Sequence, residues 1–333
     1  MTRLRTAILG CGGFARRHAE NFIEMADQVE MVAFCDRNLD RAEGYAAEFT
    51  GGQATVFTDH HELFAQAELD FVTVCLPPYG HSDEVECAAA AGVHIFMEKP
   101  IALSSEQAWR MVEVAEAAGI VTQVGFMFRF GTAIQRLKAF IDSGEAGPAG
   151  LMSARYFCNS LHGRWWRDRE KSGGQLVEQI IHMVDLMRFL MGEAETVYSV
   201  QRNLFHQDVP DYTVEDTSST VFGFENGGIG VIYASNNAIP GQWINDYRVV
   251  TQKMMAEFSD ANNALFTYTA EEPLRVEAVK SAENIYKLEM LALFDAIATG
   301  RSANTPLREG AKSLDLALAA VRSAESGAVA TVG

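Results

Sequence analysis

The sequence is poor in basic residues. It has 27 lysines and arginines against 44 aspartates and glutamates, so its formal net charge is −17. This excess of negative charge argues against nucleic acids and anionic membrane surfaces as partners, because their phosphates would be repelled. Of the 333 residues, 48% are hydrophobic and 21% are charged, which is typical of a globular chain long enough for two domains.

Paired cysteines and long apolar runs are also missing. The five cysteines are Cys11, Cys35, Cys75, Cys87 and Cys158. Their spacing is not that of a metal site, so we predict no bound metal and expect small buried thiols in a reducing compartment. No run approaches the length of a membrane span and the N-terminus has no signal-peptide pattern, so we expect a cytoplasmic protein.

The most informative stretch runs from Gly10 to Ala15 and fits the pattern G-x-G-x-x-A. It follows a short apolar run and leads into a helix-like segment, which is the context of a dinucleotide-binding turn. Gly12 lets a pyrophosphate approach the backbone, and the helix N-terminus offers N–H groups to it. Asp36, which closes a second apolar run, can accept hydrogen bonds from a ribose diol. A glycine turn in another kind of α/β domain is the alternative.

The first part of the chain alternates strand-like and helix-like segments. The expected strands are 5–9, 29–35, 71–76, 94–97 and 120–124, and the expected helices are 14–26, 39–49, 60–67, 81–91 and 105–118. Asp59 with Glu62, and Ser104 with Gln107, have the spacing of capping boxes. The alternation predicts a doubly wound parallel sheet, a Rossmann domain over residues 1–124, with ligands beyond the carboxyl ends of its strands.

After about residue 125 the pattern changes. The expected elements are an amphipathic helix over 174–190 ended by Gly192, strands at 196–202, 218–225, 230–235 and 248–252, and helices near 287–298 and 308–326. Asn226-Gly227-Gly228 predicts a hairpin. The pattern predicts an α+β domain over residues 125–333 with a large open, mainly antiparallel sheet, for binding substrate. An open face needs covering, so we expect a homo-dimer or homo-tetramer formed through this sheet.

Glu98-Lys99-Pro100 follows an expected strand at the carboxyl edge of the parallel sheet. Pro100 restricts Lys99 to an extended backbone, which fixes the direction of its side chain. An ammonium group at this edge, where a nicotinamide would lie, could exchange a proton with a substrate hydroxyl. A surface lysine at a strand end is the alternative.

Glu178, His182 and Asp185 form a second group of candidate catalytic residues, on the expected helix over 174–190. Offsets of four and three place them on one helix face, where a carboxylate can orient the imidazole as a general base. One alternative is a surface salt bridge such as Asp185 with Arg188, and another is a metal site.

Other candidates are weaker. The loop Arg164-Trp165-Trp166-Arg167-Asp168-Arg169 could stack on a sugar ring and hold its hydroxyls, or form a subunit contact. His81 could shape the cofactor site or cap a helix, and Arg129 lies in an apolar stretch between the domains. His60 and His61 fall in the first turn of a helix, where we expect them to be solvated.

With these motifs in place, the chain resembles the Gfo/Idh/MocA family of oxidoreductases over nearly its whole length. The resemblance rests on Gly10–Ala15, Asp36, Pro77–His81, Glu98-Lys99-Pro100 and Gly173–Asp185. It implies an N-terminal Rossmann domain, a C-terminal open antiparallel sheet and a tightly held NAD(H) or NADP(H). It also implies that Lys99 and His182 are the catalytic pair and that the Lys99–Pro100 peptide bond is cis. Two positions depart from the family pattern, since Glu178 stands for a common Asp and Met127 for a common Asn.

These observations predict an NAD(P)-dependent dehydrogenase that acts on a secondary hydroxyl of a sugar, cyclitol or related polyol. His182 would take the hydroxyl proton, Lys99 would hydrogen-bond the developing alkoxide, and Glu178 would orient His182. The expected cofactor-binding residues are Gly10, Gly12, Gly13, Phe14, Ala15, Asp36, Arg37, Leu76, Pro77, His81, Glu98 and Lys99. The expected substrate-binding residues are Lys99, Arg129, Trp166, Arg167, Glu178, Gln179 and His182.

Asp36 favours NAD as the cofactor, although Arg37 beside it could receive the 2′-phosphate of NADP. Two other functions stay open on the sequence alone. One is a dinucleotide-dependent lyase or glycoside hydrolase that oxidises its substrate transiently, and the other is a non-catalytic NAD(P)-binding regulator.

Overall fold

The computed structural model describes residues 3–332, and the chain divides into two compact units. The first unit comprises the chain up to Gly125 together with Tyr286–Ala311. The second unit comprises Phe126–Ile285 together with the chain from Lys312 onward.

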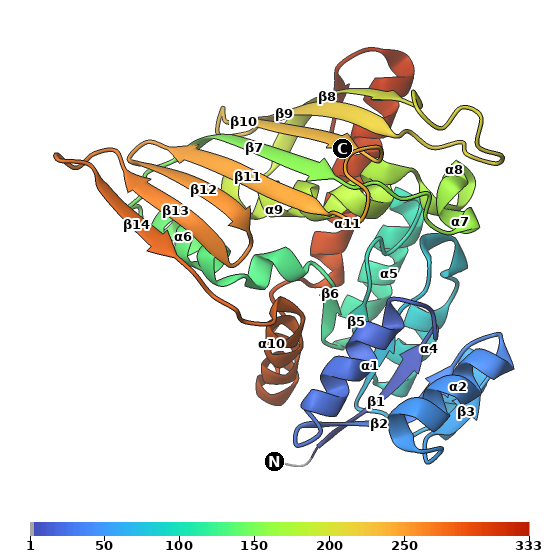
Figure 1. Cartoon of the computed structure of the whole chain (residues 1–333). Helices are drawn as coiled ribbons and strands as arrows, with labels where there is room; N and C mark the ends of the chain where they lie inside the picture. The colour runs from blue at the N-terminus through green and yellow to red at the C-terminus, as the bar shows by residue number, and fades with distance from the viewer. Residues whose placement is uncertain (1–2, 333) are drawn as a thin grey trace. The chain divides into compact units, whose positions relative to one another are not determined.

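A six-stranded parallel sheet forms the middle of the first unit, in the order β3-β2-β1-β4-β5-β6 (Figure 1). Its strands are β1 (Leu4–Leu9), β2 (Val29–Cys35), β3 (Thr55–Phe57), β4 (Phe71–Val74), β5 (His94–Met97) and β6 (Thr122–Val124). All neighbouring strands pair in parallel, which confirms the predicted Rossmann sheet. The sequence does not predict β3, because only Phe57 of its three residues is buried.

The helices of the first unit are α1 (Ala15–Glu24), α2 (Leu39–Thr50), α3 (His60–Gln66), α4 (Glu84–Ala91), α5 (Ser105–Ala118) and nearly all of α10 (Ile285–Thr299), with a 3-10 turn η1 (Pro78–Gly80). Two expected N-caps are present, since Ser104 accepts from Gln107 N and Asp59 accepts from His61 N. The helix expected over 81–91 begins only at Glu84. The carboxylate of Glu84 accepts a hydrogen bond from Ser82 N, which lies before the helix.

The segment Tyr286–Ala311 packs in the first unit, although the sequence pattern predicts it within the domain over residues 125–333. Met290, Leu293 and Phe294 of α10 share a buried cluster with core residues of the parallel sheet and of α1. After α10, Val124 N on β6 donates to Thr305 O at 2.7 Å, and Thr305 Oγ1 donates to Val124 O at 2.8 Å. The late segment therefore completes both the core and one edge of the first unit.

A nine-stranded sheet dominates the second unit, in the order β14-β13-β12-β11-β7-β10-β9-β8-β15. Its strands are β7 (Ala149–Phe157), β8 (Ala194–Arg202), β9 (Thr217–Phe224), β10 (Ile229–Ser235), β11 (Ile244–Thr251), β12 (Met254–Asp260), β13 (Asn263–Tyr268), β14 (Arg275–Val279) and β15 (Ala330–Thr331). Only β7 and β10 pair in parallel, so the sheet is mainly antiparallel as predicted. The hairpin expected at Asn226-Gly227-Gly228 joins β9 to β10.

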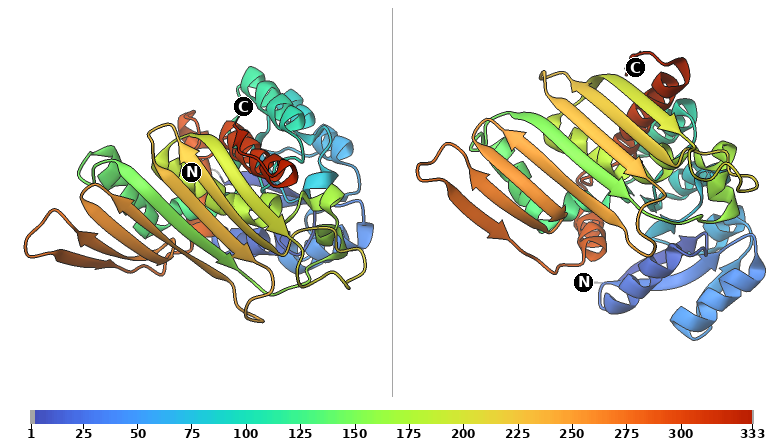
Figure 2. Two further views of the ribbon diagram at one scale, coloured as in Figure 1. Left: turned by 90° about the horizontal axis from the view of Figure 1, so that it is seen from above. Right: turned by 45° about the horizontal axis from the view of Figure 1, so that its top comes forward.

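Helices cover one face of this sheet. They are α6 (Thr132–Asp142), α9 (Ile181–Met191) and α11 (Leu307–Ser326), the last of which begins in the first unit; shorter elements are η2 (Met127–Phe130), α7 (Arg164–Arg167), α8 (Arg169–Ser172) and η3 (Leu176–Ile180). On the other face, residues such as Val221 and Ile229 are exposed, while their neighbours Phe222 and Ile232 are buried beneath the sheet. In Figure 2, right, no described helix of the second unit crosses this outer face.

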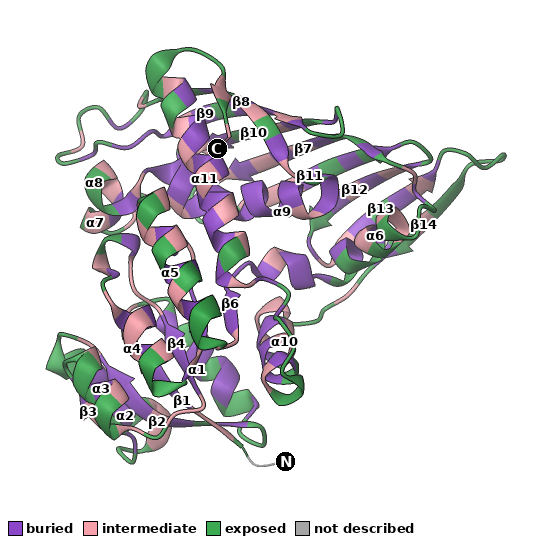
Figure 3. Ribbon diagram, turned by 180° about the vertical axis from the view of Figure 1, so that it is seen from behind, coloured by how far each residue is buried: buried purple, intermediate pink, exposed green. Residues whose placement is uncertain are grey.

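The segment expected to form one amphipathic helix over 174–190 has a different structure. It begins with η3, a single π-helical turn, and continues as α9, which Gly192 ends with a φ of +95°. Ten of the eleven residues of α9 are buried, so the amphipathic prediction is wrong (Figure 3). Among residues 3–332, no helix is long and apolar enough to cross a membrane.

Candidate active site

The glycine turn after β1 requires glycine at its first position. Gly10 has a φ of +93°, and a Cβ atom there would lie 2.7 Å from the carbonyl oxygen of Cys75. A side chain would therefore be both strained and blocked by the neighbouring strand. Ala15 is fully buried at the start of α1, so the small side chain lets α1 pack closely.

The space in front of this turn is open. No atom lies within 4 Å of a Cβ built on Gly12 or Gly13. The first turn of α1 has no acidic residue, and Phe14, its N-cap residue, makes no capping hydrogen bond through its side chain. The N–H groups at this helix start can therefore bind a phosphate, as the sequence predicts.

Asp36 follows β2 beside the glycine turn, and its carboxylate is held by two backbone donors. Cys11 N donates to Asp36 Oδ2 at 2.9 Å, and Asn38 N donates to Asp36 Oδ1 at 2.8 Å. Tyr45 fixes the same turn by donating to Gly12 O at 2.6 Å. Arg37 is exposed next to Asp36. A carboxylate fixed in this way is positioned for a ribose diol, so these residues fit an NAD molecule.

Leu76-Pro77 lie just beyond the end of β4, and Glu98-Lys99 directly follow β5. Because β1, β4 and β5 are parallel neighbours, these residues share one edge of the sheet with the glycine turn. Lys99 is half-buried, its N–H donates to Glu98 Oε2 at 3.3 Å, and the Lys99–Pro100 bond is cis as the resemblance implies. Glu98 is itself buried, with its Oε1 atom 2.6 Å from Nε2 of His18.

His81 lies at the same edge but is buried rather than presented to a ligand. Its Nδ1 atom lies 2.5 Å from Oε1 of Glu84. The role of His81 in shaping the cofactor site stays a prediction. The buried positions of Cys11 and Cys35 raise the pKa of both thiols to about 12, so neither is a nucleophile.

In the second unit, a buried carboxylate anchors the helix that carries Glu178 and His182. Leu176 N donates to Glu215 Oε1 at 2.7 Å, and Arg169 donates to Glu215 Oε2 at 2.8 Å. Gly174 has a φ of +94°, and a Cβ there would lie 2.5 Å from Glu215 Oε2. Burial raises the pKa of Glu215. Glu215 gives no signal in the sequence, because its partners lie about forty positions away.

Asp185 does not pair with Arg188, so that alternative is wrong. Arg129 binds Asp185 in a bidentate pair, with Nε and Nη2 at 2.7 and 2.6 Å from the two carboxylate oxygens. Both side chains are nearly fully buried. Arg188 binds Glu193 instead. Because a buried pair of this kind fixes geometry, Arg129 and Asp185 position η2 against α9 within the second unit.

Glu178, Gln179 and His182 lie near the start of this helix, and each contacts a residue of another segment. Trp166 Nε1 donates to Glu178 Oε2 at 2.7 Å, and Nε2 atoms of Gln179 and His162 lie 3.0 Å apart. His162 has a left-handed φ of +53°, which is uncommon for a non-glycine residue, and its ring lies 4.3 Å from that of Trp166. His182 is buried beside the rings of Phe126 and Phe128.

Trp166 and Arg167 lie in the loop predicted to hold a sugar. Trp166 is only 2% exposed and supports Glu178, and Arg167 donates to the carbonyl oxygens of Leu161 and His162. Stacking of Trp166 on a sugar stays a prediction. His162, two residues before this loop, lies beside both Trp166 and Gln179.

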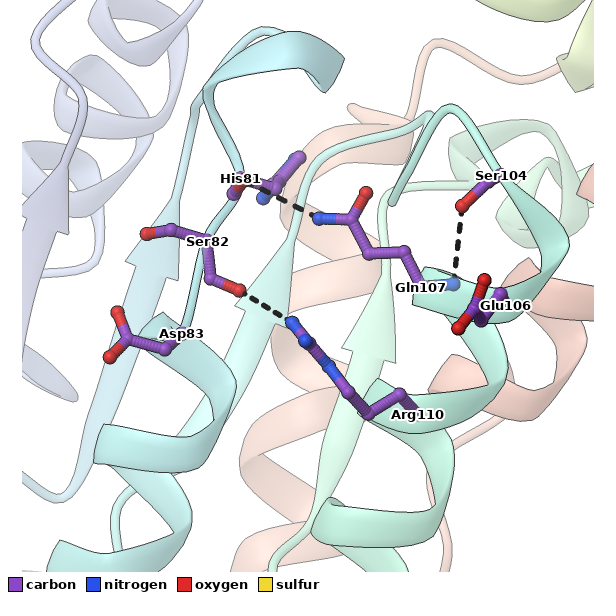
Figure 4. Close-up of a pocket in the computed structure, with 7 residues that line it drawn as sticks. All are labelled: His81, Ser82, Asp83, Ser104, Glu106, Gln107 and Arg110. Carbon is purple, nitrogen blue, oxygen red and sulfur yellow. Dashed lines mark hydrogen bonds between the residues drawn. The ribbon is translucent and has the colours of Figure 1, made fainter.

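The first unit has a surface hollow that no residue of the glycine turn lines (Figure 4). Its lining consists of His81, Ser82, Asp83, Ser104, Glu106, Gln107 and Arg110. Gln107 and Arg110 already donate to the carbonyl oxygens of His81 and Ser82. Its donors are thus engaged by the protein, and of the predicted site residues it contains only His81.

Comparison with known proteins agrees with this geometry. Residues 4–126 match the family described as an oxidoreductase family with an NAD-binding Rossmann fold, and residues 134–257 match the GFO/IDH/MocA C-terminal domain. The chain is 30% identical over 242 residues to a D-glucoside 3-dehydrogenase of Escherichia coli strain K12, and the alignment covers 68% of each protein. It is 29% identical over 239 residues to a myo-inositol 2-dehydrogenase of Thermotoga maritima, covering 72% of this chain and 70% of that protein.

Among solved structures, a levoglucosan dehydrogenase in complex with NADH and L-sorbose has the same fold. The TM-score is 0.92 over the full length of both chains, at 20% sequence identity. The glycine turn, the fixed Asp36 carboxylate and both matched domains lead to one assignment. This chain belongs to the Gfo/Idh/MocA family of NAD-binding oxidoreductases.

Proposed function

We propose that this protein is an NAD-dependent dehydrogenase acting on a secondary hydroxyl of a sugar, cyclitol or related polyol. The observation that carries the proposal is the position of Lys99, which follows β5 on the sheet edge that also carries the glycine turn. The two relatives named above, dehydrogenases of a D-glucoside and of myo-inositol, support the same substrate class.

The chain's own groups would hold the cofactor in an ordinary Rossmann manner. Backbone N–H groups at Gly12, Gly13 and the start of α1 bind the pyrophosphate, and Asp36 accepts hydrogen bonds from the adenosine ribose. When bound, the nicotinamide exchanges a hydride with the substrate carbon.

Lys99 and His182 handle the substrate hydroxyl. Lys99 Nζ donates a hydrogen bond to the oxygen as negative charge develops on it, and His182 accepts the hydroxyl proton. Glu178 orients His182, and the indole of Trp166 fixes the carboxylate of Glu178 for this role. In the reductive direction the same groups return the proton.

Replacing Lys99 tests this assignment. Lys99→Ala is expected to lower kcat by roughly 10²- to 10⁴-fold, because it removes a proton-transfer and charge-stabilising group. NADH should still bind, as followed by its fluorescence, because the glycine turn and Asp36 are unchanged. Lys280→Ala, at an exposed lysine of the second unit, is the matched control and should keep full activity. Unchanged turnover in Lys99→Ala would remove Lys99 from the mechanism.

The substrate is found with a panel of sugars and inositols, each offered with NAD⁺ and with NADP⁺ and followed by nicotinamide absorbance. We expect faster turnover with NAD⁺, because the Asp36 carboxylate would repel a 2′-phosphate. Cleavage of a glycoside without net absorbance change would instead indicate transient oxidation.

We also propose that the protein forms a homo-dimer or homo-tetramer through the outer face of the nine-stranded sheet. Several apolar side chains on that face are exposed, among them Leu151 at 41%, Val221 at 42%, Ile229 at 49% and Val250 at 39%. A contiguous apolar patch of this kind is typical of a surface that another chain covers.

A further inference from the structure

Two neighbouring histidines at the start of α3 face the start of α4 within the first unit. His60 and His61 are the first two residues of α3, Asp83 is the N-cap of α4, and Cys87 lies four positions after Asp83. Nε2 of His60 lies 2.8 Å from Asp83 Oδ1, and Nε2 of His61 lies 3.0 Å from Asp83 Oδ2. One donor atom from each of the four residues lies within 4.8 Å of the others.

A fifth residue holds one of these histidines in place. Asp59 accepts a hydrogen bond from His61 N at 2.9 Å, and the same Oδ1 atom lies 2.8 Å from Nδ1 of His61. This contact leaves Nε2 of His61 directed at Asp83. A carboxylate on the far nitrogen of a ligating histidine is the usual outer contact of a metal site. The contact between Asp59 and His61 is a second observation, separate from the fact that the four donor atoms lie close together.

We propose that His60, His61, Asp83 and Cys87 bind one zinc ion, which links the first turns of α3 and α4. Zn²⁺ takes four ligands from imidazole, thiolate and carboxylate, and at ordinary bond lengths neighbouring tetrahedral ligand atoms lie about 3.4 to 3.7 Å apart. The four donor atoms lie within 4.8 Å of one another, and the two histidine–Asp83 distances are 2.8 and 3.0 Å. Metal binding would therefore require side-chain rotations that bring all four to tetrahedral separations. The imidazole and thiol donors favour zinc over magnesium or calcium, which prefer oxygen.

The surroundings suit a cation that enters from solvent. The side chains of His61 and Asp83 are 54% and 50% exposed. In Figure 4 the Asp83 carboxylate points away from Gln107 and Arg110, so no cation of α5 neutralises it. The N-termini of two helices carry partial positive charge, which opposes a metal ion, but Asp59 and Asp83 place two full negative charges there. On binding, the thiol of Cys87 gives its proton to solvent and the thiolate joins the metal.

Metal titration of the full-length protein tests the proposal, with any affinity tag removed and the protein first treated with a chelator. Calorimetry with ZnCl₂ should show one ion per chain. Cobalt(II) in its place should show a tetrahedral spectrum with a thiolate-to-metal charge-transfer band. Cys87→Ser should abolish that band, and Asp59→Asn should weaken zinc binding by about 10- to 100-fold.

Glu62→Gln is the matched control, because it removes an exposed carboxylate from the same turn of α3 without removing a ligand. It should keep the stoichiometry and the spectrum. His61→Ala should lose zinc binding while far-UV circular dichroism shows a folded chain. Two results would overturn the proposal. One is that the wild-type protein shows no saturable zinc binding. The other is that Cys87→Ser and His61→Ala bind zinc as well as the wild type does, in which case the four residues form only a hydrogen-bonded surface cluster.

Discussion

The side chain of Glu289 lies in the core of the first unit, where Glu98 is also buried. It is 1% exposed, and neither of its carboxylate oxygens has a hydrogen-bond partner among the described residues. Burial, and then the negative charge of Glu98, raise its pKa well above the ordinary value. The folded protein therefore holds Glu289 protonated under conditions in which the unfolded chain ionises it.

The stability of the protein should consequently depend on Glu289 and pH. Below the unfolded pKa of about 4.3 the group is protonated in both states, so it adds no pH dependence. As the pH rises from there toward the raised folded pKa, the folded state retains a proton that the unfolded state loses. Folding stability then falls by up to about 1.4 kcal/mol per pH unit.

Glu289→Gln should remove this part of the decline in folding stability with rising pH. Urea unfolding midpoints from pH 4 to 8 should separate from those of the wild type as pH rises, with the variant more stable. Glu283→Gln, at an exposed glutamate shortly before α10, should follow the wild type. Parallel curves for Glu289→Gln and wild type would contradict the raised pKa.

Which residues could be predicted from the sequence depends on how local their partners are. Gly10, Asp36 and Lys99 follow strands directly, so motif and strand end together place them at one sheet edge. Glu215 and Cys87 have no such signal, because their neighbours lie in other elements. His60 and His61 are adjacent in sequence, yet only the packing of α3 on α4 brings Asp83 and Cys87 to them.

The entry into η3 and α9 depends on a close contact between Gly174 and Glu215. Gly174 adopts a backbone conformation that side chains rarely take, and it leaves room for the carboxylate that binds Leu176 N. A methyl group at this position would have to displace a buried charged side chain whose other partner is Arg169. The start of the helix that carries Glu178 and His182 is therefore sensitive to this one position.

Gly174→Ala should lower the free energy of unfolding by about 1–3 kcal/mol more than Gly144→Ala does. Gly144 has a φ of +79° but open space around its Cβ position, so it reproduces the backbone strain without the clash. Chemical denaturation of the two variants measures the difference. Equal losses would mean that strain alone matters at Gly174. If the kcat of Gly174→Ala also changes, the cause is movement of the start of the helix that carries Glu178 and His182.

Elements with a strong apolar pattern could be predicted, and those without one could not. Strands β2 and β5 match their expected bounds because most of their residues are buried, five of seven in β2 and three of four in β5. Strand β14 was invisible, since four of its five residues are not buried. Helix α9 was expected to have a polar outer face, but its polar residues are paired inside: Asp185 with Arg129, and Arg188 with Glu193.

The exposed outer face of the nine-stranded sheet leads to a prediction about mass. Leu151, Ile229 and Val250 lie side by side in register on β7, β10 and β11. Wild-type protein should scatter light as a multiple of 36.6 kDa, and the double variant Leu151→Lys, Ile229→Lys should shift toward the monomer. Lysines in the middle of an apolar interface would be desolvated and repel each other.

Ile23→Lys is the control for that experiment. Ile23 is 52% exposed on α1 of the first unit and is not part of the nine-stranded sheet, so its replacement should leave the mass unchanged. A wild-type mass equal to one chain at micromolar concentration would refute self-association through this face.

Because Tyr286–Ala311 packs in the first unit, that unit cannot complete its core until late in synthesis of the chain. Met290, Leu293 and Phe294 complete a core whose other members leave the ribosome more than 150 residues earlier. At ordinary translation speeds the nucleotide-binding half waits on the order of ten seconds with its hydrophobic interior unfinished. A fragment ending at Gly125 would stay in that unfinished condition permanently, so chaperones and proteases would meet it as an incomplete nascent protein.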